Sequence, residues 1–204
     1  SARKGSAAFP QVRLMTLLNV TSRRLLEVDM ASYTGKGTGE RSLVRAILAR
    51  LTNPKLLFLL DAGLYALDML WRIVQAGGVF IVKVPGQVKL KRVQRLADGS
   101  WLAEITGQII DPVMPRTVSG RQQWKTVTLT VRVLRLEIRG FRPFCLMTNL
   151  LDPAITAREI ALHYHRRWDL EIAYDEIKTH QCATLRGQSP TTFRSKLPEL
   201  VKQE

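Results

Sequence analysis

A continuous apolar run, Leu56-Leu-Phe-Leu-Leu60, constrains the fold more than any other stretch of the sequence. A run of this kind is typical of a strand that is buried on both faces of a sheet. An amphipathic helix is expected after it, from about Leu64 to Gln75, and Gly77-Gly78 is expected to end that helix. Val79–Val84 then predicts a further strand, so the segment favours an α/β fold.

Asp61 follows the apolar run directly, at the carboxyl end of the expected strand. Ligands of open α/β sheets bind at the carboxyl ends of the strands, so a carboxylate at this point favours a functional role. The alternative is that Asp61 caps the N-terminus of the helix that follows. The sequence leaves both interpretations open.

Three elements are expected before the apolar run. Gln11–Val20 and Leu25–Tyr33 predict two strands of a hairpin, and Glu40–Leu51 predicts an amphipathic helix. The glycine-rich segment Tyr33–Glu40 lacks the glycine spacing and the Lys-Ser/Thr pair of a phosphate-binding loop. It is therefore expected to be a flexible loop.

The segment after Pro85 is basic and β-rich. Residues 86–145 hold 11 Lys and Arg against 4 Asp and Glu, a net charge of +7. Three strands are expected in it, and the apolar alternation of the third shifts at Leu134, which predicts a bulge: Val88–Ala97, Trp101–Ile110 and Trp124–Ile138. The expected organisation is a core part over 1–85, a basic insertion over 86–142, and a last core strand with a helix over 143–204.

The charge of the whole chain indicates its class of partner. The 204 residues include 31 Lys and Arg against 17 Asp and Glu, which gives +14 and a pI near 10.5. Such a charge favours nucleic acid first and an acidic membrane surface second. No apolar run is long enough to cross a bilayer. Cys145 and Cys182 have neither metal-type spacing nor a disulfide framework, so we expect reduced thiols and a cytoplasmic protein.

A long helix is expected over about residues 156–180. Thr156 and Glu159 have the spacing of a capping box, which marks its start. At a helical period four polar residues share one face: Tyr164, Arg167, Glu171 and Lys178. The expected buried stripe lies on the opposite face and consists of Leu162, Leu170, Ala173 and Ile177. The alternative is an ordinary solvated face, because Arg167 and Glu171 would pair on any surface helix.

The spacing Tyr-x2-Arg-x3-Glu-x6-Lys, with Trp168 directly after the arginine, resembles the signature of bacterial insertion-sequence transposases of family four. These enzymes use Asp-Asp-Glu (DDE) chemistry. Four further segments carry the resemblance over nearly the whole chain: Phe9–Leu14, Gly39-Glu40, Asp61–Tyr65 and Met147–Leu150. The resemblance implies a ribonuclease-H-like mixed sheet with flanking helices and a basic β-rich insertion.

The resemblance also implies roles for particular residues. Asp61 and Glu171 would be catalytic carboxylates that hold Mg²⁺ or Mn²⁺ in a two-metal site. Tyr164, Arg167 and Lys178 would bind DNA phosphate. Trp168 would stack on a displaced base, or else be a partly buried helix residue. The implied reaction is cleavage at transposon ends and transfer of the freed 3′ ends into target DNA, by a homodimer on bacterial DNA.

The sequence departs from the family pattern at its front. The acidic residues before Asp61 are Glu27, Asp29 and Glu40, and none has the context of the family's first catalytic aspartate. We therefore expect the first, central strand of the sheet to be missing, and the chain to be inactive alone. The alternatives are a non-catalytic DNA-binding remnant of a transposase, and a β-rich protein that binds RNA or membranes. Binding through the basic insertion is expected to weaken steeply with salt.

Overall fold

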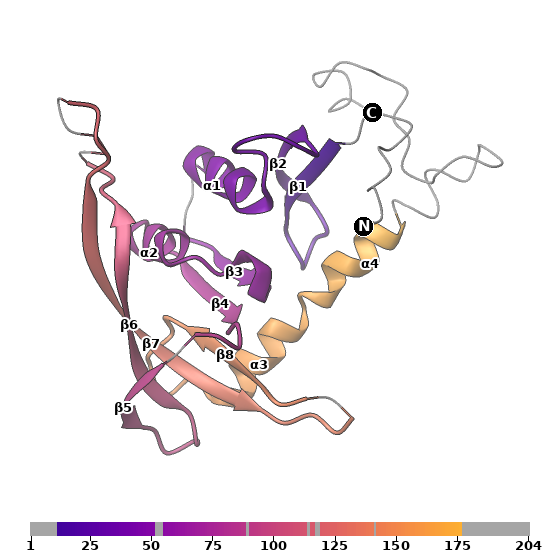
Figure 1. Cartoon of the computed structure of the whole chain (residues 1–204). Coiled ribbons are helices and arrows are strands. Elements are labelled where there is room, and N and C mark those ends of the chain that lie inside the picture. The colour runs from indigo at the N-terminus through magenta and orange to yellow at the C-terminus, as the bar shows by residue number, and fades with distance from the viewer. Residues whose placement is uncertain are drawn as a thin grey trace, which may run out of the picture. The chain divides into compact units, whose positions relative to one another are not determined.

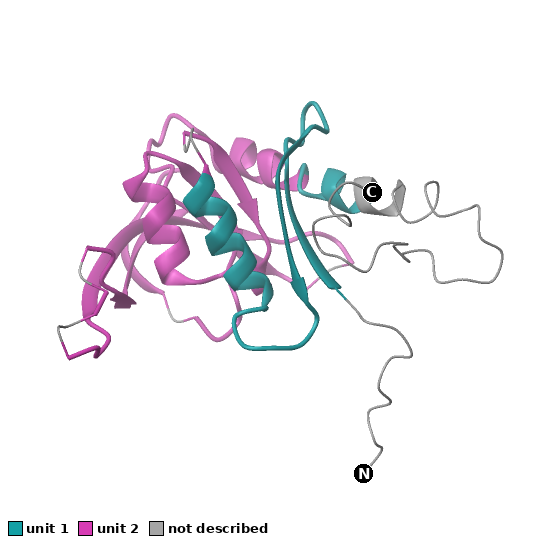
Figure 2. Ribbon diagram, turned by 90° about the horizontal axis from the view of Figure 1, so that it is seen from above, with its two compact units in different colours: residues 1–50, 166–204 teal, residues 51–165 magenta. Residues whose placement is uncertain are grey.

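A computed structural model describes residues 12–51, 55–88, 90–113, 115–116, 119–140 and 142–176 (Figure 1). The chain divides into two compact units, which Figure 2 distinguishes by colour: residues 1–50 with 166–204, and residues 51–165. Lys178, Ile177, Cys182 and the helix expected near the end of the chain lie outside the described residues.

Among its described residues, the first unit contains a hairpin and two helices. Its elements are β1 (Val12–Leu18), β2 (Leu25–Ser32), α1 (Glu40–Arg50) and α4 (Trp168–Glu176). The two strands pair antiparallel, and the Asn19 side chain accepts the backbone N–H groups of Thr21 and Ser22 at 2.9 Å in the turn. The expected hairpin and the first expected helix are confirmed.

The second unit is built on a mixed sheet of six strands. The order in the sheet is β3-β4-β8-β7-β6-β5, in which β3 and β4 are parallel and every other pair is antiparallel. The bounds are β3 (Leu57–Leu60), β4 (Val79–Lys83), β5 (Lys91–Arg95), β6 (Trp101–Ile110), β7 (Trp124–Leu136) and β8 (Phe144–Thr148). The expected α/β class is confirmed. The three strands of the predicted insertion continue this sheet through the β7–β8 pair, and the division at residues 86 and 142 stays a prediction.

Helices cover both faces of this sheet (Figure 1). On one face, α2 (Leu67–Gln75) packs so closely that a Cβ added at Gly107 of β6 would lie 2.7 Å from Leu67 Cδ2. On the other face, α3 (Ala157–His165) contributes Ile160 and Tyr164 to a buried apolar cluster. The sheet members of that cluster are Ile81, Leu134 and Leu146.

The expected bulge in β7 is wrong. The shift in its apolar alternation arises because helices pack on both faces of the sheet. The strand pairs with β6 from Trp124 to Val133 and with β8 from Arg132 to Leu136, without a register shift in either pairing. The four residues Val131–Leu134 are all buried. Apolar residues therefore occupy both faces here, and α3 packs against the second face.

The strand β3 is an edge strand, and the expectation that it is buried on both faces is wrong. Phe58 and Leu60 are buried, whereas Leu57 is 40% exposed. Its partner is β4 on one side, and the cluster beneath α3 reaches only as far as Leu59. Alternate residues of β3 consequently differ in burial.

In the described residues, the helix expected over 156–180 is two helices, and the expected buried stripe is wrong at Leu162. The start is confirmed, because Thr156 and Glu159 form the capping box: the Thr156 amide donates to Glu159 Oε2 at 2.7 Å, and the Glu159 amide donates to Thr156 Oγ1 at 3.2 Å. However, α3 ends at His165 and α4 begins at Trp168. Tyr164 is buried and Leu162 is 58% exposed. The face of α3 that becomes buried is the one that packs against the sheet, and the helical period of the sequence did not indicate it.

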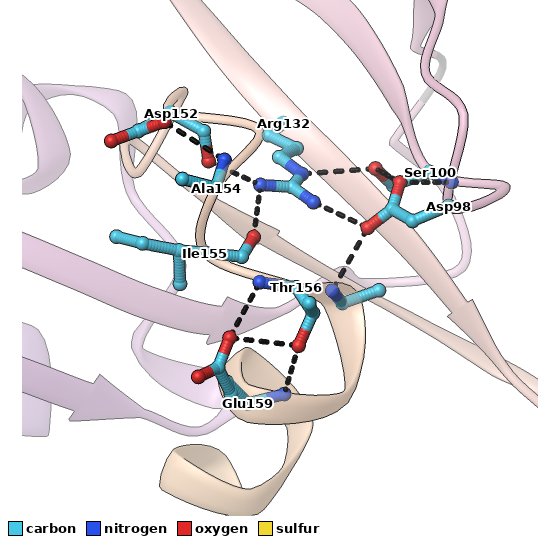
Figure 3. Close-up of polar contacts among 9 residues, drawn as sticks. Asp98, Ser100, Arg132, Asp152, Ala154, Ile155, Thr156 and Glu159 are labelled. Atoms are coloured by element: carbon cyan, nitrogen blue, oxygen red, sulfur yellow. Dashed lines mark hydrogen bonds and ion pairs between the residues drawn. The ribbon is translucent and has the colours of Figure 1, made fainter.

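A network of polar contacts joins the turn between β5 and β6 to the start of α3 (Figure 3). The guanidinium of Arg132 is at its centre. It donates to Ser100 Oγ at 2.9 Å, to the carbonyls of Asp152 and Ile155 at 2.8 and 2.7 Å, and to the carboxylate of Asp98. The same Asp98 carboxylate accepts the backbone N–H of Ala157 at 2.8 Å.

This network predicts a pH dependence of stability. Partial burial raises the pKa of Asp98, but hydrogen bonds from Ser100, from the Ala157 amide and from Arg132 outweigh it and lower the pKa from 3.8 to about 2. A carboxyl whose pKa is lower in the folded protein stabilises it above its unfolded pKa. That contribution is lost as the pH falls from about 4 through about 2.

We therefore expect Asp98→Asn to be less stable than the parent at pH 6, with a difference that shrinks by pH 2.5. Urea unfolding of both proteins at the two pH values measures it. The other carboxyls titrate in both proteins and cancel in the comparison. An unchanged difference between the two pH values would show that the Asp98 charge does not stabilise the fold.

Candidate functional site

Asp61 occupies the carboxyl end of β3 with an exposed side chain. Its backbone is extended, with φ −78° and ψ 164°, and its carbonyl accepts the Leu64 amide at 3.0 Å. A 3-10 turn, η1 (Ala62–Leu64), begins directly after it. The Asp61 side chain makes no capping hydrogen bond in the described structure, and the N-cap of α2 is Ala66. The capping alternative is therefore wrong.

Tyr164 lies next to the same end of β3. Its hydroxyl donates to the backbone carbonyl of Leu60, the residue before Asp61, at 3.3 Å. The side chain is 7% exposed and belongs to the cluster beneath α3. The structure thus brings one residue of the signature and the predicted catalytic aspartate to the same strand end, both within the second unit. The expected contact of Tyr164 with DNA phosphate stays a prediction.

Tyr65 lies just beyond Asp61 in the same segment. Burial raises the pKa of the Tyr65 hydroxyl above its ordinary value of 10.0. The phenol therefore remains protonated at neutral pH, and this segment adds no second negative charge through Tyr65.

Arg167, Trp168 and Glu171 lie together in the first unit. The Arg167 guanidinium donates to Glu171 Oε1 at 2.9 Å, which is the pairing that the four-residue spacing predicts. It also lies 5.4 Å from the centroid of the Trp168 ring. The Glu171 and Trp168 side chains are 46% and 52% exposed. Both are accessible to a ligand.

The predicted metal ligands are divided between the two units. Asp61 belongs to residues 51–165 and Glu171 to residues 166–204. Each offers carboxylate oxygens, which are the donors that Mg²⁺ prefers. Among the described residues, no three His, Cys, Asp or Glu side chains lie together as metal ligands.

The acidic residues upstream of Asp61 have another role in the first unit. Arg50 of α1 pairs with Asp29 at 3.3 Å and with Glu27 at 3.5 Å, and it donates to the carbonyl of Val28 at 3.1 Å. These contacts attach the end of α1 to β2. The two carboxylates therefore have a structural explanation.

The sequence reasoning did not single out Asp98 and Arg132. The available signals were Asp98-Gly99, between two expected strands, and the shift of apolar phase near Leu134, which was interpreted as a bulge. The structure gives Arg132 no exposure at all, so one cation of the basic segment is unavailable to DNA. Exposed cations of this segment include Lys91, Arg92 and Arg95 on β5.

Asn149 belongs to Met147–Leu150, another segment that carries the family resemblance. Its side chain accepts the Phe80 amide at 2.9 Å and donates to the Gly78 carbonyl at 3.0 Å. The side-chain amide thereby fastens the end of β8 to the start of β4. This asparagine therefore connects β8 to β4, the strand next to β3.

No helix among the described residues is both long enough and apolar enough to span a membrane.

The chain is thus a basic, mixed α/β protein with an exposed aspartate at a strand end and a Tyr-Arg-Glu motif. A family model described as "Transposase DDE domain" matches residues 1–196, and the chain belongs to this family. The family indicated by the signature is therefore confirmed.

One relative is the transposase InsG for insertion sequence element IS4 from Escherichia coli (strain K12). It is 26% identical over 203 residues, which cover 97% of this chain and 42% of the relative. The chain spans less than half the length of this relative.

Proposed function

We propose that this chain is part of the catalytic domain of an insertion-sequence transposase, and that Asp61 and Glu171 are its metal ligands. The observation that carries the proposal is the position of Asp61. Its exposed carboxylate follows β3, makes no capping bond in the described structure, and adjoins the residue that Tyr164 binds. A carboxylate held in this way is available to a ligand.

The proposed fold is ribonuclease-H-like. Support comes from the mixed sheet with α2 and α3 on opposite faces, and from β3 at the sheet edge. In such a fold a further strand would lie beside β3 and contribute another aspartate. The sequence from Val12 to Leu60 offers Glu27 and Asp29 on β2 and Glu40 on α1, so we propose that this chain alone does not complete the site.

The proposed cofactor is Mg²⁺ or Mn²⁺, two ions in the complete enzyme. Bound between carboxylates, such ions activate an attacking oxygen and stabilise the leaving oxygen of a phosphodiester. Asp61 and Glu171 would supply the oxygen ligands from this chain. Arg167 already holds Glu171 by an ion pair, and its guanidinium suits bidentate contact with phosphate.

The proposed substrate is DNA at the transposon ends and at the target. The net charge of +14 supports a polyanionic partner. Trp168 is exposed enough to stack on a base, and Lys178 would add a phosphate contact. We propose a homodimer on DNA and a cytoplasmic, nucleoid-associated location.

A titration with Mn²⁺ tests the proposal, with calorimetry as the measurement. The parent chain is expected to bind one ion weakly, because it supplies two carboxylates at most from the predicted set. Asp61→Ala and Glu171→Ala are each expected to weaken the binding at least about tenfold. Glu137→Ala is a matched control, because Glu137 is an exposed carboxylate whose partner is Arg135. Asp61→Ala binding Mn²⁺ like the parent would refute the assignment.

The second candidate function is a DNA-binding remnant without chemistry. It is favoured by the pairing of Asp29 and Glu27 with Arg50, which gives both carboxylates a structural role. This candidate predicts DNA binding that weakens steeply with salt, without any Mn²⁺ binding that depends on Asp61. The same titration therefore separates the two functions.

A further inference from the structure

Arg132 is fully buried in the sheet, at 0% exposure. A buried guanidinium is costly unless it is paired and hydrogen-bonded, and replacement of a whole buried ion pair by well-packed apolar side chains often leaves stability unchanged. Stability alone is therefore a weak reason for an arginine here. Its contacts suggest a geometric reason.

The contacts of Arg132 connect β7 to two segments that are distant in the sequence. One is the turn between β5 and β6, through Asp98 and Ser100. Another is the loop before α3, through the carbonyls of Asp152 and Ile155. Asp98 then carries the connection to the first residue of α3 by accepting the Ala157 amide. The turn and strand β7 thus fix the start of the helix.

The far end of the same helix reaches the candidate site. Tyr164 lies seven residues after Ala157, a rise of about 10 Å along an α-helix. Its hydroxyl donates to the Leu60 carbonyl, across 104 positions of sequence. The nine residues of α3, held by their backbone hydrogen bonds, form the connection between the polar network and this contact.

We propose that Asp98 and Arg132 are positioning residues for Asp61, acting through α3 and the Tyr164 hydroxyl on the Leu60 carbonyl. Asp61 and η1 follow Leu60 directly, so their backbone depends on where that carbonyl is held. The proposal rests on the proposed function in one respect only, which is that Asp61 is a metal ligand. The positioning itself is a property of the second unit.

Amide hydrogen exchange measured by NMR tests the positioning. The reporters are the Leu64 and Tyr65 amides, which donate to the Asp61 and Ala62 carbonyls at 3.0 and 3.2 Å. Asp98→Asn is expected to speed their exchange about two- to tenfold, the range that the loss of one ordinary hydrogen bond gives. The milder asparagine is used because Arg132→Met is expected to destabilise the whole unit.

Two comparisons distinguish positioning from local or global loosening. The Phe80 amide, in the buried part of β4, reports global opening, and its exchange is expected to rise with the overall loss of stability in Asp98→Asn. The two reporters are expected to exchange faster than Phe80 in both proteins, which shows that they open locally. Arg135→Met is the control variant, because Arg135 is exposed on the same strand and pairs with Glu137. It is expected to leave the reporters unchanged. Faster exchange confined to the start of α3 would overturn the proposal, and so would reporters that exchange only as fast as Phe80, through global opening.

A double-mutant cycle tests the route through Tyr164. Tyr164→Phe removes the hydroxyl but keeps the ring in the cluster. In that background Asp98→Asn is expected to cause little further change at Leu64 and Tyr65. Full additivity of the two substitutions would contradict transmission through the hydroxyl.

A Mn²⁺ titration of Asp98→Asn then links positioning to the site. We expect affinity to fall by about two- to tenfold while the protein stays folded. A parent that binds no Mn²⁺ refutes the proposed function but leaves the exchange experiment decisive for positioning. Unchanged affinity in a variant with faster reporter exchange would refute the link between the two.

Discussion

Replacement of Arg132 by methionine is expected to lower the free energy of unfolding by about 3–5 kcal/mol. Methionine fills a similar volume but donates no hydrogen bond. The Asp152 and Ile155 carbonyls, Ser100 and Asp98 would each lose a donor. The cost comes mainly from these partners, which remain in the folded protein with their hydrogen-bonding capacity unmet. Urea unfolding followed by circular dichroism measures the loss.

Two further variants show whether the arginine itself or its partner carries the effect. Arg135→Met removes an exposed ion pair from the same strand and is expected to change stability by less than about 1 kcal/mol. Adding Asp98→Asn to Arg132→Met removes the carboxylate that has lost its cation. The double variant is therefore expected to cost less than the sum of the two single variants. A loss below about 1 kcal/mol for Arg132→Met would refute the importance of the buried contacts.

Replacement of Tyr164 by alanine is expected to cost about 3–5 kcal/mol, as for other large aromatic side chains in a core. The ring fills space between α3 and the sheet, where it packs with Ile160, Leu134 and Ile81. Tyr164→Phe keeps the ring and removes the hydroxyl that donates to the Leu60 carbonyl. That change is expected to cost about 0.5–1.5 kcal/mol. Urea unfolding again measures both.

The two Tyr164 variants also separate the structural role from the implied role at DNA. Tyr33→Ala is the control, because Tyr33 is 53% exposed. This substitution is expected to lower the free energy of unfolding by less than about 1 kcal/mol. DNA affinity of Tyr164→Phe, measured by fluorescence anisotropy at fixed salt, reports any phosphate contact by the hydroxyl. A loss of affinity without a loss of stability would favour the DNA role. A loss of stability of less than about 1 kcal/mol in Tyr164→Ala would contradict the packing role.

Features that depend on neighbouring residues could be predicted from the sequence. The capping box of Thr156 and Glu159 uses spacing alone, and it forms at the start of α3 as expected. The hairpin, α1 and β6 follow from local alternation and turn residues in the same way. The ion pair between Arg167 and Glu171 also needs only one turn of helix. Each of these is fixed within a few residues of chain.

Features that depend on distant partners could not be predicted in this way. The buried face of α3 depends on Ile81, Leu134 and Leu146, which come from three different strands. A single helical period extended to residue 180 therefore placed Tyr164 on the wrong side of the helix. Arg132 followed an alternating strand pattern as an outward residue, and only α3 and the turn at Asp98 make its position an interior one.

The candidate site likewise has one feature that depends on neighbouring residues and one that depends on distant partners. The exposed aspartate at the end of β3 follows from an apolar run and the residue after it, so sequence could indicate Asp61. The contact of Tyr164 with Leu60 joins residues 104 positions apart, and no local pattern contains it. The family resemblance indicated Asp61 and Tyr164, whereas the partner of the Tyr164 hydroxyl, the Leu60 carbonyl, is known only from the structure.

The long-range closure of the second unit by α3 has a consequence during synthesis. A nascent chain that has emerged only as far as β8 has all six strands, but it lacks the helix that covers Ile81, Leu134 and Leu146. Until residues 157–165 leave the ribosome, this apolar surface remains open to water and to other chains. Loop closure over so many residues is also entropically slow. The helix that supplies Tyr164 to the candidate site thus also ends the exposure of this surface, to which a chaperone would bind until then.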